Sequence, residues 1–163
     1  MGKEVEILVE VCRDNIELPK YANVGDAGMD VRAAVDVDIL PGETVVIPTG
    51  LKVAIPLGYE IQVRPRSGTS LKTPLRLVNS PGTIDSGYRD EVGVIMHNSS
   101  REGSEVFSIS DKGNKQGIYR IKAGERIAQI VLNEVPVIKW KTVEDVSLEG
   151  INRGGGFGSS GTN

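Results

Sequence analysis

Aromatic residues and cysteine are scarce in this sequence of 163 residues. Phe, Trp and Tyr together make up only 4% of the chain, so the core has to consist mainly of Val, Ile and Leu, which favour strands over helices. Cys12 is the single cysteine. An intramolecular disulfide is therefore excluded, and a reducing compartment is expected. The length corresponds to one domain that can bury an ordinary core.

Long apolar runs and an excess of positive charge are also missing. The N-terminal stretch MGKEVEILVEV lacks the apolar run of a signal peptide, and no stretch reaches membrane-spanning length. The net charge of −3 argues against duplex nucleic acid as a partner, because binding to its backbone normally needs a basic face. We therefore expect a soluble, cytoplasmic protein that binds neither nucleic acid nor membrane. A small anionic ligand is compatible with this charge.

Apolar and polar residues alternate along most of the chain, and this pattern predicts an all-β fold. Residues 5–11, 31–39 and 59–64 are expected to form half-buried strands, and residues 125–131 a buried one. Turn signals rich in Gly and Pro separate these segments at intervals typical of β-sandwiches or barrels. No amphipathic helix of useful length is expected, although Ser67 can cap a single helical turn.

Two segments interrupt this alternation. Residues 99–117 are long and polar and are expected to form a hairpin between two strands. Residues 151–163 are too rich in glycine to hold structure alone, because ordering a glycine costs more backbone entropy than ordering any other residue. We therefore expect a β-domain over residues 1–150 and a flexible C-terminal arm over residues 151–163. The ring of Phe157 is unusual in a plain linker and indicates a function for the arm.

The stretch GTIDSGYRDEVGV, residues 82–94, places polar side chains where a plain strand is expected. The preceding NSPG, residues 79–82, can reverse the chain, after which Asp85 and Tyr88 project from a short irregular strand. The glycines allow a ligand to touch the backbone, so this hairpin can present N–H and C=O groups to a flat heterocycle. A solvent-exposed bulged hairpin is the alternative interpretation.

Residues 64–70, RPRSGTS, combine two guanidinium groups with hydroxyls and free N–H groups at the start of the expected helical turn. Converging N–H donors and a bidentate arginine are suited to phosphate, although a solvated basic turn has the same composition. In the expected strand 125–131, Arg126 and Gln129 need polar partners if the strand is buried. Asp30 follows a turn and can act simply as its cap.

Five segments occur in the same order, and at similar spacing, as the five sequence motifs of the trimeric dUTPases. They are AGMDVRAA, PRSGTS, NSPGTIDSGYRDE, GERIAQIV and RGGGFGSSG, and they span residues 27–161. The sequence therefore resembles a deoxyuridine 5'-triphosphate nucleotidohydrolase. This resemblance implies a jelly-roll-like β-barrel, a homotrimer with active sites at subunit interfaces, and an arm that closes each site. It also implies hydrolysis of dUTP to dUMP and pyrophosphate with Mg²⁺, which limits uracil incorporation into DNA and supplies dUMP.

The resemblance also assigns roles to individual residues. Asp85 is the implied catalytic residue, which accepts the sugar 3′-hydroxyl and orients or deprotonates the attacking water. Tyr88 is expected to pack on the deoxyribose and to exclude a 2′-hydroxyl. Asp30 is expected to support the metal–phosphate arrangement, with no direct protein ligand to Mg²⁺. The other implied substrate contacts are Arg66, Ser67, Gly68 and Gln129 for the phosphates, Asn79, Gly82, Thr83 and Ile84 for uracil, Arg153, Ser159 and Ser160 for the γ-phosphate, and Phe157 for covering the base.

The sequence departs from the family pattern in its last motif and in the polar segment. Arg153 lies one residue closer to Phe157 than usual, and residues 99–117 resemble the extended versions found in some phage enzymes. Two alternatives stay open. A dCTP deaminase shares the fold and needs a glutamate base near the pyrimidine amino group, for which Glu91 is the nearest candidate. A regulatory protein that binds a partner through residues 99–117 is the other alternative, as a role added to catalysis.

Overall fold

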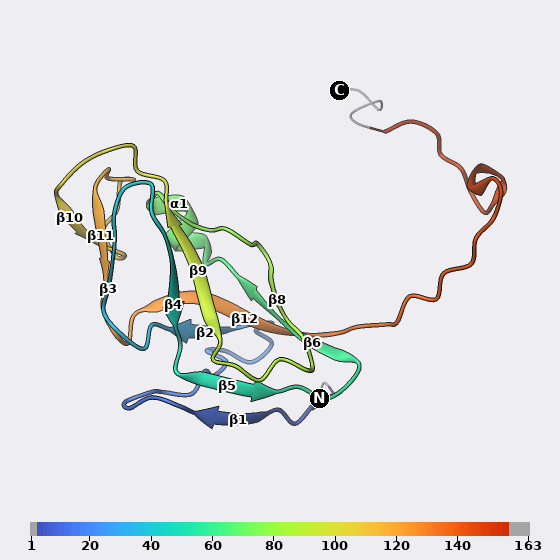
Figure 1. The fold of residues 1–163 in the computed structure, drawn as a ribbon, viewed down its shortest axis with the longest axis horizontal. Coiled ribbons are helices and arrows are strands. Elements are labelled where there is room, and N and C mark those ends of the chain that lie inside the picture. The colour runs from blue at the N-terminus through green and yellow to red at the C-terminus, as the bar shows by residue number, and fades with distance from the viewer. Residues whose placement is uncertain (1–2, 157–163) are drawn as a thin grey trace.

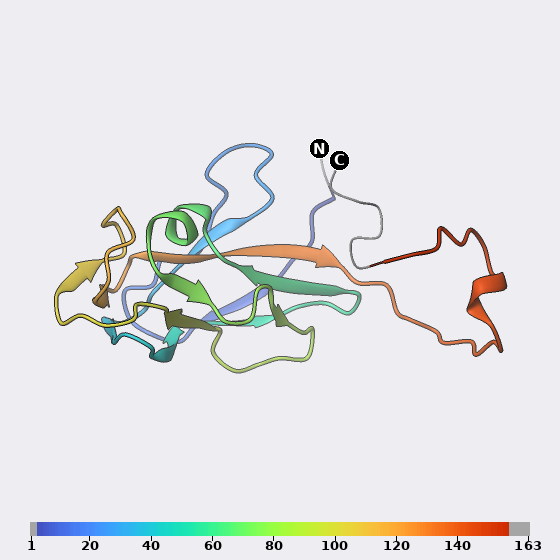
Figure 2. The ribbon, with the colours of Figure 1, turned by 90° about the horizontal axis from the view of Figure 1, so that it is seen from above.

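The computed structural model describes residues 3–156, which form a body built almost entirely of β-strands and a long C-terminal extension (Figure 1, Figure 2). The strands among the described residues are β1 (Leu8–Val11), β2 (Met29–Arg32), β3 (Val37–Ile39), β4 (Thr44–Pro48), β5 (Leu51–Ala54), β6 (Tyr59–Arg64), β7 (Leu75–Leu77), β8 (Gly82–Ile84), β9 (Gly93–Asn98), β10 (Val106–Ser108), β11 (Ile118–Ile121) and β12 (Arg126–Glu134). A short helix, α1 (Ser67–Lys72), follows β6, and a 3-10 turn, η1 (Val146–Leu148), lies in the extension.

Over residues 3–156 these strands pair into four sheets that surround one core (Figure 1). The sheet that carries most candidate site residues has the order β2-β12-β6-β8, and the others have the orders β4-β9-β7, β10-β11-β3 and β1-β5. Neighbouring strands are antiparallel except β10 and β11, which are parallel. The body is therefore a jelly-roll-like barrel, and the all-β prediction is confirmed.

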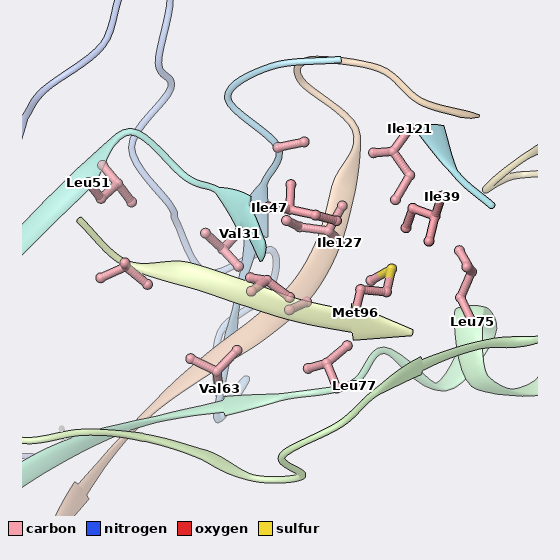
Figure 3. Close-up of a cluster of buried hydrophobic side chains, with 14 of the residues drawn as sticks. Val31, Ile39, Ile47, Leu51, Val63, Leu75, Leu77, Met96, Ile121 and Ile127 are labelled. Carbon is pink, nitrogen blue, oxygen red and sulfur yellow. The ribbon is translucent and has the colours of Figure 1, made fainter. Parts of the chain in front are cut away.

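Aliphatic side chains from several strands meet in the core (Figure 3). Ile39, Ile47, Met96 and Ile127 are each 0% exposed, and truncating a buried aliphatic side chain typically costs about 2–5 kcal/mol. Tyr119 is one of the few aromatic residues among them, and its burial raises the pKa of its hydroxyl. The core is therefore aliphatic, as the composition predicted.

Two expected strands are confirmed and two need correction. β6 coincides with the segment 59–64, and β12 corresponds to the segment 125–131 but begins at Arg126 and continues to Glu134. The alternation over residues 31–39 does not form one strand, because the chain turns between β2 and β3, which lie in different sheets. The expected half-buried strand at residues 5–11 is β1, but its four residues are all exposed. Both faces of this strand are therefore left partly uncovered by its own chain.

α1 covers the helical turn expected near Ser67, but Ser67 is its first residue and not its cap. The cap is Arg66, which has extended backbone angles and makes no capping hydrogen bond with its side chain. The prediction of Ser67 as the cap was therefore wrong. Within residues 3–156, no helix is long and apolar enough to cross a membrane.

Residues 99–117 do not form the expected hairpin, because β10 runs parallel to β11. Buried side chains fix the two ends of the segment. The Asn98 amide donates to the carbonyls of Ile39 at 2.9 Å and Gly117 at 2.8 Å, and the N–H of Gly117 donates to the Ser100 hydroxyl at 3.1 Å. Both ends of the segment are thus tied to the barrel. Its role as a contact for a protein partner stays a prediction.

The chain leaves the barrel after β12. The N–H of Val135 donates to the carbonyl of Gly58 at 2.8 Å, and the residues that follow run away from the body in both views (Figure 1, Figure 2). Large apolar side chains are exposed along this extension, residues 136–156, including Val137 at 93% and Trp140 at 85%. The division into a domain up to residue 150 and a flexible arm after it stays a prediction.

Candidate active site

The chain around β8 surrounds a pocket of about 160 Å³. Five of the residues predicted to contact the base and sugar line it together: Asn79, Gly82, Thr83, Ile84 and Tyr88. Val63, Val92, Gly93 and Ile95 complete the lining. The pocket is therefore small and combines an amide, backbone groups and aliphatic surface, a combination that suits a flat polar ring.

The lack of a side chain at Gly82 shapes this pocket. A Cβ at Gly82 would lie 3.1 Å from the amide nitrogen of Asn79 and 3.4 Å from the Cβ of Val63. The first distance is tighter than an ordinary contact and the second is at the lower limit of one, so a side chain here would displace the Asn79 amide by a few tenths of an ångström. The glycine thus allows the amide and the strand backbone to approach a ligand together.

Tyr88 lies at the rim of the pocket on a turn fixed by hydrogen bonds. Its N–H donates to the carbonyl of Asp85 at 3.1 Å, and its hydroxyl donates to the carbonyl of Glu91 at 3.0 Å. Asp85 is the first residue after β8 and is exposed on the same turn. The predicted catalytic carboxylate and the predicted sugar-contacting ring are therefore held in one rigid connection.

The carboxylate of Glu91 is fully engaged within the protein. The Arg13 guanidinium donates to its two oxygens at 2.6 and 2.9 Å, and the N–H of Gly50 donates to it at 2.8 Å. The hydrogen bonds from Arg13 hold the pKa of Glu91 below its ordinary value. A carboxylate held in this way is poorly suited to take a proton from a pyrimidine ring, which argues against Glu91 as a deaminase base.

The structure also reveals a contribution of Arg13 that the sequence analysis missed. Arg13 lies outside the five motifs and 78 positions from Glu91. No local pattern could have identified it, because an arginine near a strand end is ordinary and its partner is chosen only by folding.

The residues predicted to contact phosphate gather at a second place on the same sheet. Arg66 donates to one oxygen of Asp30 at 2.9 Å, and Arg126 donates to the other at 3.3 Å. Gln129 lies directly between Asp30 on β2 and Arg64 on β6. Ser67 and Gly68 follow at the start of α1. The cluster is rich in guanidinium groups and suits an anion.

Arg126 and Gln129 are exposed, and this corrects the expectation that they interrupt a buried strand. After the register irregularity, β12 faces the core with Ala128, and Ile130 and Leu132 lie partly buried against the core, whereas Gln129 lies on the other face. Arg126 finds its polar partner in Asp30. The misreading arose because Ile127 and Ala128 are consecutive buried residues at a register irregularity between Arg126 and Ala128, which breaks the simple alternation.

Val63, Gly82 and Ile84 of the pocket lie on the face of the sheet opposite the arginine cluster, whereas Thr83, which pairs with Gln62, lies on the same face as the cluster. Directly paired residues of antiparallel strands share a face, whereas successive residues of one strand alternate. Gln129 pairs with Arg64, and both are exposed. The next residue back, Val63, pairs with Gly82, and both are buried. Within one chain, the two groups of candidate residues therefore do not face a common cavity.

Side chains that could bind a metal ion do not cluster in the described part of the chain. Residues 3–156 contain no group of three or more His, Cys, Asp or Glu side chains that could hold a metal ion. Both oxygens of Asp30 accept hydrogen bonds from arginines. This arrangement fits an Asp30 that orients guanidinium groups and does not bind a metal directly.

Of the residues predicted in the C-terminal arm, the structure describes only Arg153, which does not line the pocket. Arg153 is exposed in the extension. Phe157, Ser159 and Ser160 lie outside the described residues.

The all-β barrel, the small polar pocket and the arginine cluster are the features of a nucleotide-binding protein, and comparison with known proteins defines the family. The dUTPase family model matches residues 14–161. The deoxyuridine 5'-triphosphate nucleotidohydrolase of Fusobacterium nucleatum is 44% identical over 162 residues, which cover 98% of this chain and 99% of the relative. This chain therefore belongs to the dUTPase family.

Solved phage structures share the fold. A mutant dUTPase of Staphylococcus bacteriophage 80alpha with dUpNHpp matches with a TM-score of 0.83 and 33% identity, over 96% of this chain and 99% of that chain. A mutant dUTPase from phage phi11 of S. aureus, in which a structural Mg(II) ion is coordinated, matches with a TM-score of 0.76 and 32% identity, over 88% and 99%. Phage dUTPases are thus structural relatives of this chain.

Proposed function

We propose that this chain hydrolyses dUTP to dUMP and pyrophosphate by attack of water on the α-phosphorus. This activity limits uracil incorporation into DNA and supplies dUMP. Membership of the dUTPase family supports the proposal. The observation that carries it in the structure is the pocket around β8, which gathers Asn79, Gly82 and Tyr88 beside Asp85.

Recognition of the base follows from the polar groups of this pocket. Uracil presents oxygen acceptors at O2 and O4 on either side of the N3 donor, which the Asn79 amide and the backbone of β8 can match. Cytosine would set a donor against a donor and leave buried groups unpaired, at about 1–3 kcal/mol each. The close walls also disfavour a methyl group on C5, and the ring of Tyr88 occupies the space that a ribose 2′-hydroxyl would need.

Asp85 is the proposed catalytic residue. It accepts the sugar 3′-hydroxyl and orients or deprotonates the attacking water, while Arg66, Ser67, Gly68 and Gln129 hold the phosphates. Positioning and charge neutralisation account for most of the rate enhancement in phosphoryl transfer. Mg²⁺, held by triphosphate oxygens and water, supplies positive charge against the phosphates. Asp30 supports this arrangement by fixing Arg66 and Arg126.

A homotrimer is the proposed assembly, with each active site shared between chains. The base pocket is lined by none of the residues of the arginine cluster, so a second copy can bring a cluster to each pocket. Apolar surface is also left uncovered. Val137 and Trp140 are exposed in the extension, and a further groove on the barrel is lined by Ile7, Val9, Leu18, Pro19, Met29, Leu51, Val53, Ile61 and Ile130. Exposed apolar surface of this extent is typical of a protein interface.

The C-terminal arm, residues 151–163, is proposed to close the site over bound nucleotide. Arg153, Ser159 and Ser160 would then meet the γ-phosphate, and Phe157 would cover the uracil. Closure would exclude water and strengthen the phosphate contacts. Glycines spread along this segment allow the backbone a close approach to the ligand.

The decisive experiment measures pyrophosphate release from dUTP, UTP, dTTP and dCTP side by side, with ammonia release from dCTP assayed in parallel. We expect pyrophosphate release from dUTP in large excess over the other three, and no ammonia. Ammonia from dCTP would show a deaminase, and equal rates on all four nucleotides would contradict the proposed recognition of uracil and deoxyribose.

A further inference from the structure

A residue of the polar segment 99–117 holds the C-terminal end of α1. Asn114 donates its backbone N–H to the carbonyl of Lys72 at 2.9 Å and its side-chain amide to the carbonyl of Leu71 at 3.0 Å. The last four carbonyls of a helix have no partner within the helix. One asparagine, 43 positions from Leu71, therefore satisfies two of them from outside.

The sequence of α1 provides little of this support by itself. The cap residue Arg66 makes no capping hydrogen bond with its side chain. At the other end Thr73, with φ −135°, donates both its N–H and its hydroxyl to the carbonyl of Thr69, and these two bonds do not reach the carbonyls of Leu71 and Lys72. A helix of six residues is far shorter than one that is stable alone in water. Tertiary contacts therefore fix α1, through Asp30 on Arg66 at one end and Asn114 at the other.

The conformation of Asn114 is suited to this contact. Its φ is 51° and that of Gly113 is 93°, and this left-handed turn directs both the N–H and the side chain of Asn114 to the same helix end. Asparagine tolerates the left-handed region better than most residues with a side chain. The Gln116 amide donates to the carbonyl of Asn114 at 3.2 Å, and its oxygen accepts from the N–H of Arg101 at 3.0 Å. Gln116 thus connects the start of the segment, at Arg101, with its end, at Asn114.

The start of the segment touches the same region. The N–H and the hydroxyl of Ser99 both donate to the carbonyl of Pro74, at 3.0 and 2.6 Å. Pro74 is the second residue after α1. Segment 99–117 therefore holds the C-terminal side of α1 at Ser99 and at Asn114, and its own ends are fixed by the buried Asn98 and Ser100.

We propose that Asn114 is a positioning residue for the triphosphate. By holding the C-terminal end of α1, Asn114 fixes the orientation of the whole helix. Ser67 and Gly68, at the start of the helix, and Arg66, before it, are thereby held in the orientation that binds the phosphates after the α-phosphate. Asn114 itself touches no substrate atom. The inference rests on the proposed function, which assigns these three residues to the phosphates. It gives segment 99–117 a role in the reaction, at whichever site of the assembly these phosphate-binding residues complete.

The test compares two nucleotides on the same protein. dUMP uses the base pocket and a single phosphate, whereas α,β-imido-dUTP with Mg²⁺ also needs the phosphate-binding residues. The dissociation constants of both are measured by calorimetry for the unmodified protein, Asn114→Asp and Asn114→Gly. The aspartate keeps the size of the side chain but replaces the donor with a carboxylate that faces the carbonyl of Leu71. The glycine tolerates the left-handed backbone and keeps only the main-chain hydrogen bond.

We expect the preference for the triphosphate analogue over dUMP to fall about 3- to 10-fold in Asn114→Asp and about 2- to 5-fold in Asn114→Gly, which is the range for losing one hydrogen bond. Asn15→Gly is the matched control, because Asn15 is also left-handed, with φ 57°, and lies in the loop before β2. The preference of Asn15→Gly for the triphosphate analogue over dUMP should equal that of the unmodified protein.

An unchanged preference in both Asn114 variants would overturn the positioning role, even if their thermal unfolding midpoints fall. Equal weakening of dUMP and the analogue would also overturn it, because that pattern indicates general destabilisation. If the unmodified protein binds neither nucleotide, the proposed function fails and this inference fails with it. Measurements on the unmodified protein thus distinguish failure of the proposed function from failure of the positioning role of Asn114.

Discussion

The guanidinium group of Arg13 donates to both carboxylate oxygens of Glu91, at 2.6 and 2.9 Å. The same glutamate accepts the Tyr88 hydroxyl on its backbone carbonyl. Arg13, in the N-terminal segment, thus holds Glu91 in place, and Glu91 in turn holds the hydroxyl of Tyr88, the ring that is proposed to contact the sugar. The pair is only partly buried, with the two side chains 42% and 24% exposed, so its effect on stability should be modest.

This ion pair predicts a pH dependence of stability. Hydrogen bonds from Arg13 and from the N–H of Gly50 lower the pKa of Glu91 below its ordinary value of 4.5. The stabilisation from the ionised carboxylate is therefore complete above that value, and it is lost as the pH falls through the lower pKa of the folded state. The difference in unfolding free energy between the unmodified protein and Glu91→Gln should be positive at pH 7 and should shrink below about pH 4.5.

Denaturant unfolding from pH 7 to pH 3 measures this difference. Glu144→Gln is the control, because Glu144 is exposed in the extension and the same change there should have little effect at any pH. A difference for Glu91→Gln that stays constant over the whole range would show that the carboxylate charge contributes nothing.

Replacement of Asp85 by Asn should abolish most turnover and leave the fold and much of the binding intact. The amide keeps the shape of the carboxylate but cannot accept a proton, and loss of a general base typically lowers the rate by about 100-fold or more. Steady-state pyrophosphate release and the affinity for α,β-imido-dUTP are measured together. Near-normal turnover in Asp85→Asn would remove Asp85 from the mechanism.

Gly82→Ala should weaken binding of both dUMP and dUTP. The new Cβ would lie 3.1 Å from the Asn79 amide nitrogen and 3.4 Å from the Val63 Cβ, so the amide has to move away from the base. Overpacking typically costs about 1–3 kcal/mol, which corresponds to about a 5- to 150-fold weaker affinity if it falls on the bound state. Gly87→Ala is the matched control, because a Cβ there meets nothing within 4 Å. Equal affinities of the two variants would contradict the tight contact.

Tyr88→Ala should reduce the discrimination between dUTP and UTP. The ring lines the pocket, and its removal opens space for a 2′-hydroxyl. Tyr88→Phe keeps the ring and loses only the hydrogen bond to the carbonyl of Glu91, so its selectivity should stay close to that of the unmodified protein. The ratio of kcat/KM values for the two nucleotides is the measurement, and an unchanged ratio in Tyr88→Ala would assign the exclusion to another group.

Two truncations should separate the extension from the arm. Deletion after Gly150 should leave a folded trimer with little activity, because the glycine-rich tail adds nothing to the core. Deletion after Glu134 also removes Val137 and Trp140, whose exposed apolar surface is proposed to pack on a second copy, and should abolish the trimer. Light scattering and thermal unfolding measure these effects.

Trp140 provides an independent measurement of the same assembly, because it is the only tryptophan. It is 85% exposed in a single chain, so its fluorescence should shift to shorter wavelength when the chains assemble. A fully active monomer with the emission of solvent-exposed tryptophan would contradict the shared site.

The sequence by itself determined the all-β class, the strands at residues 59–64 and 125–131, and the family. Strand alternation is a local property with a period of two residues, and it is visible without knowing any partner. That the predicted uracil contacts gather at one pocket could be predicted for a related reason. Asn79, Gly82 and Ile84 lie within one short turn and strand, so their proximity in space follows from their proximity in sequence.

Only the tertiary structure decided which faces and ends of the strands meet. The outward orientation of Arg126 and Gln129, the pairing of Arg13 with Glu91, and the contact of Asn114 with the end of α1 all join residues far apart in the chain. Such pairings depend on sheet order and on the register of distant strands, which local periodicity does not encode. For this reason the sequence predicted the candidate site residues one by one, whereas their separation into a pocket and an arginine cluster became visible only in the folded chain.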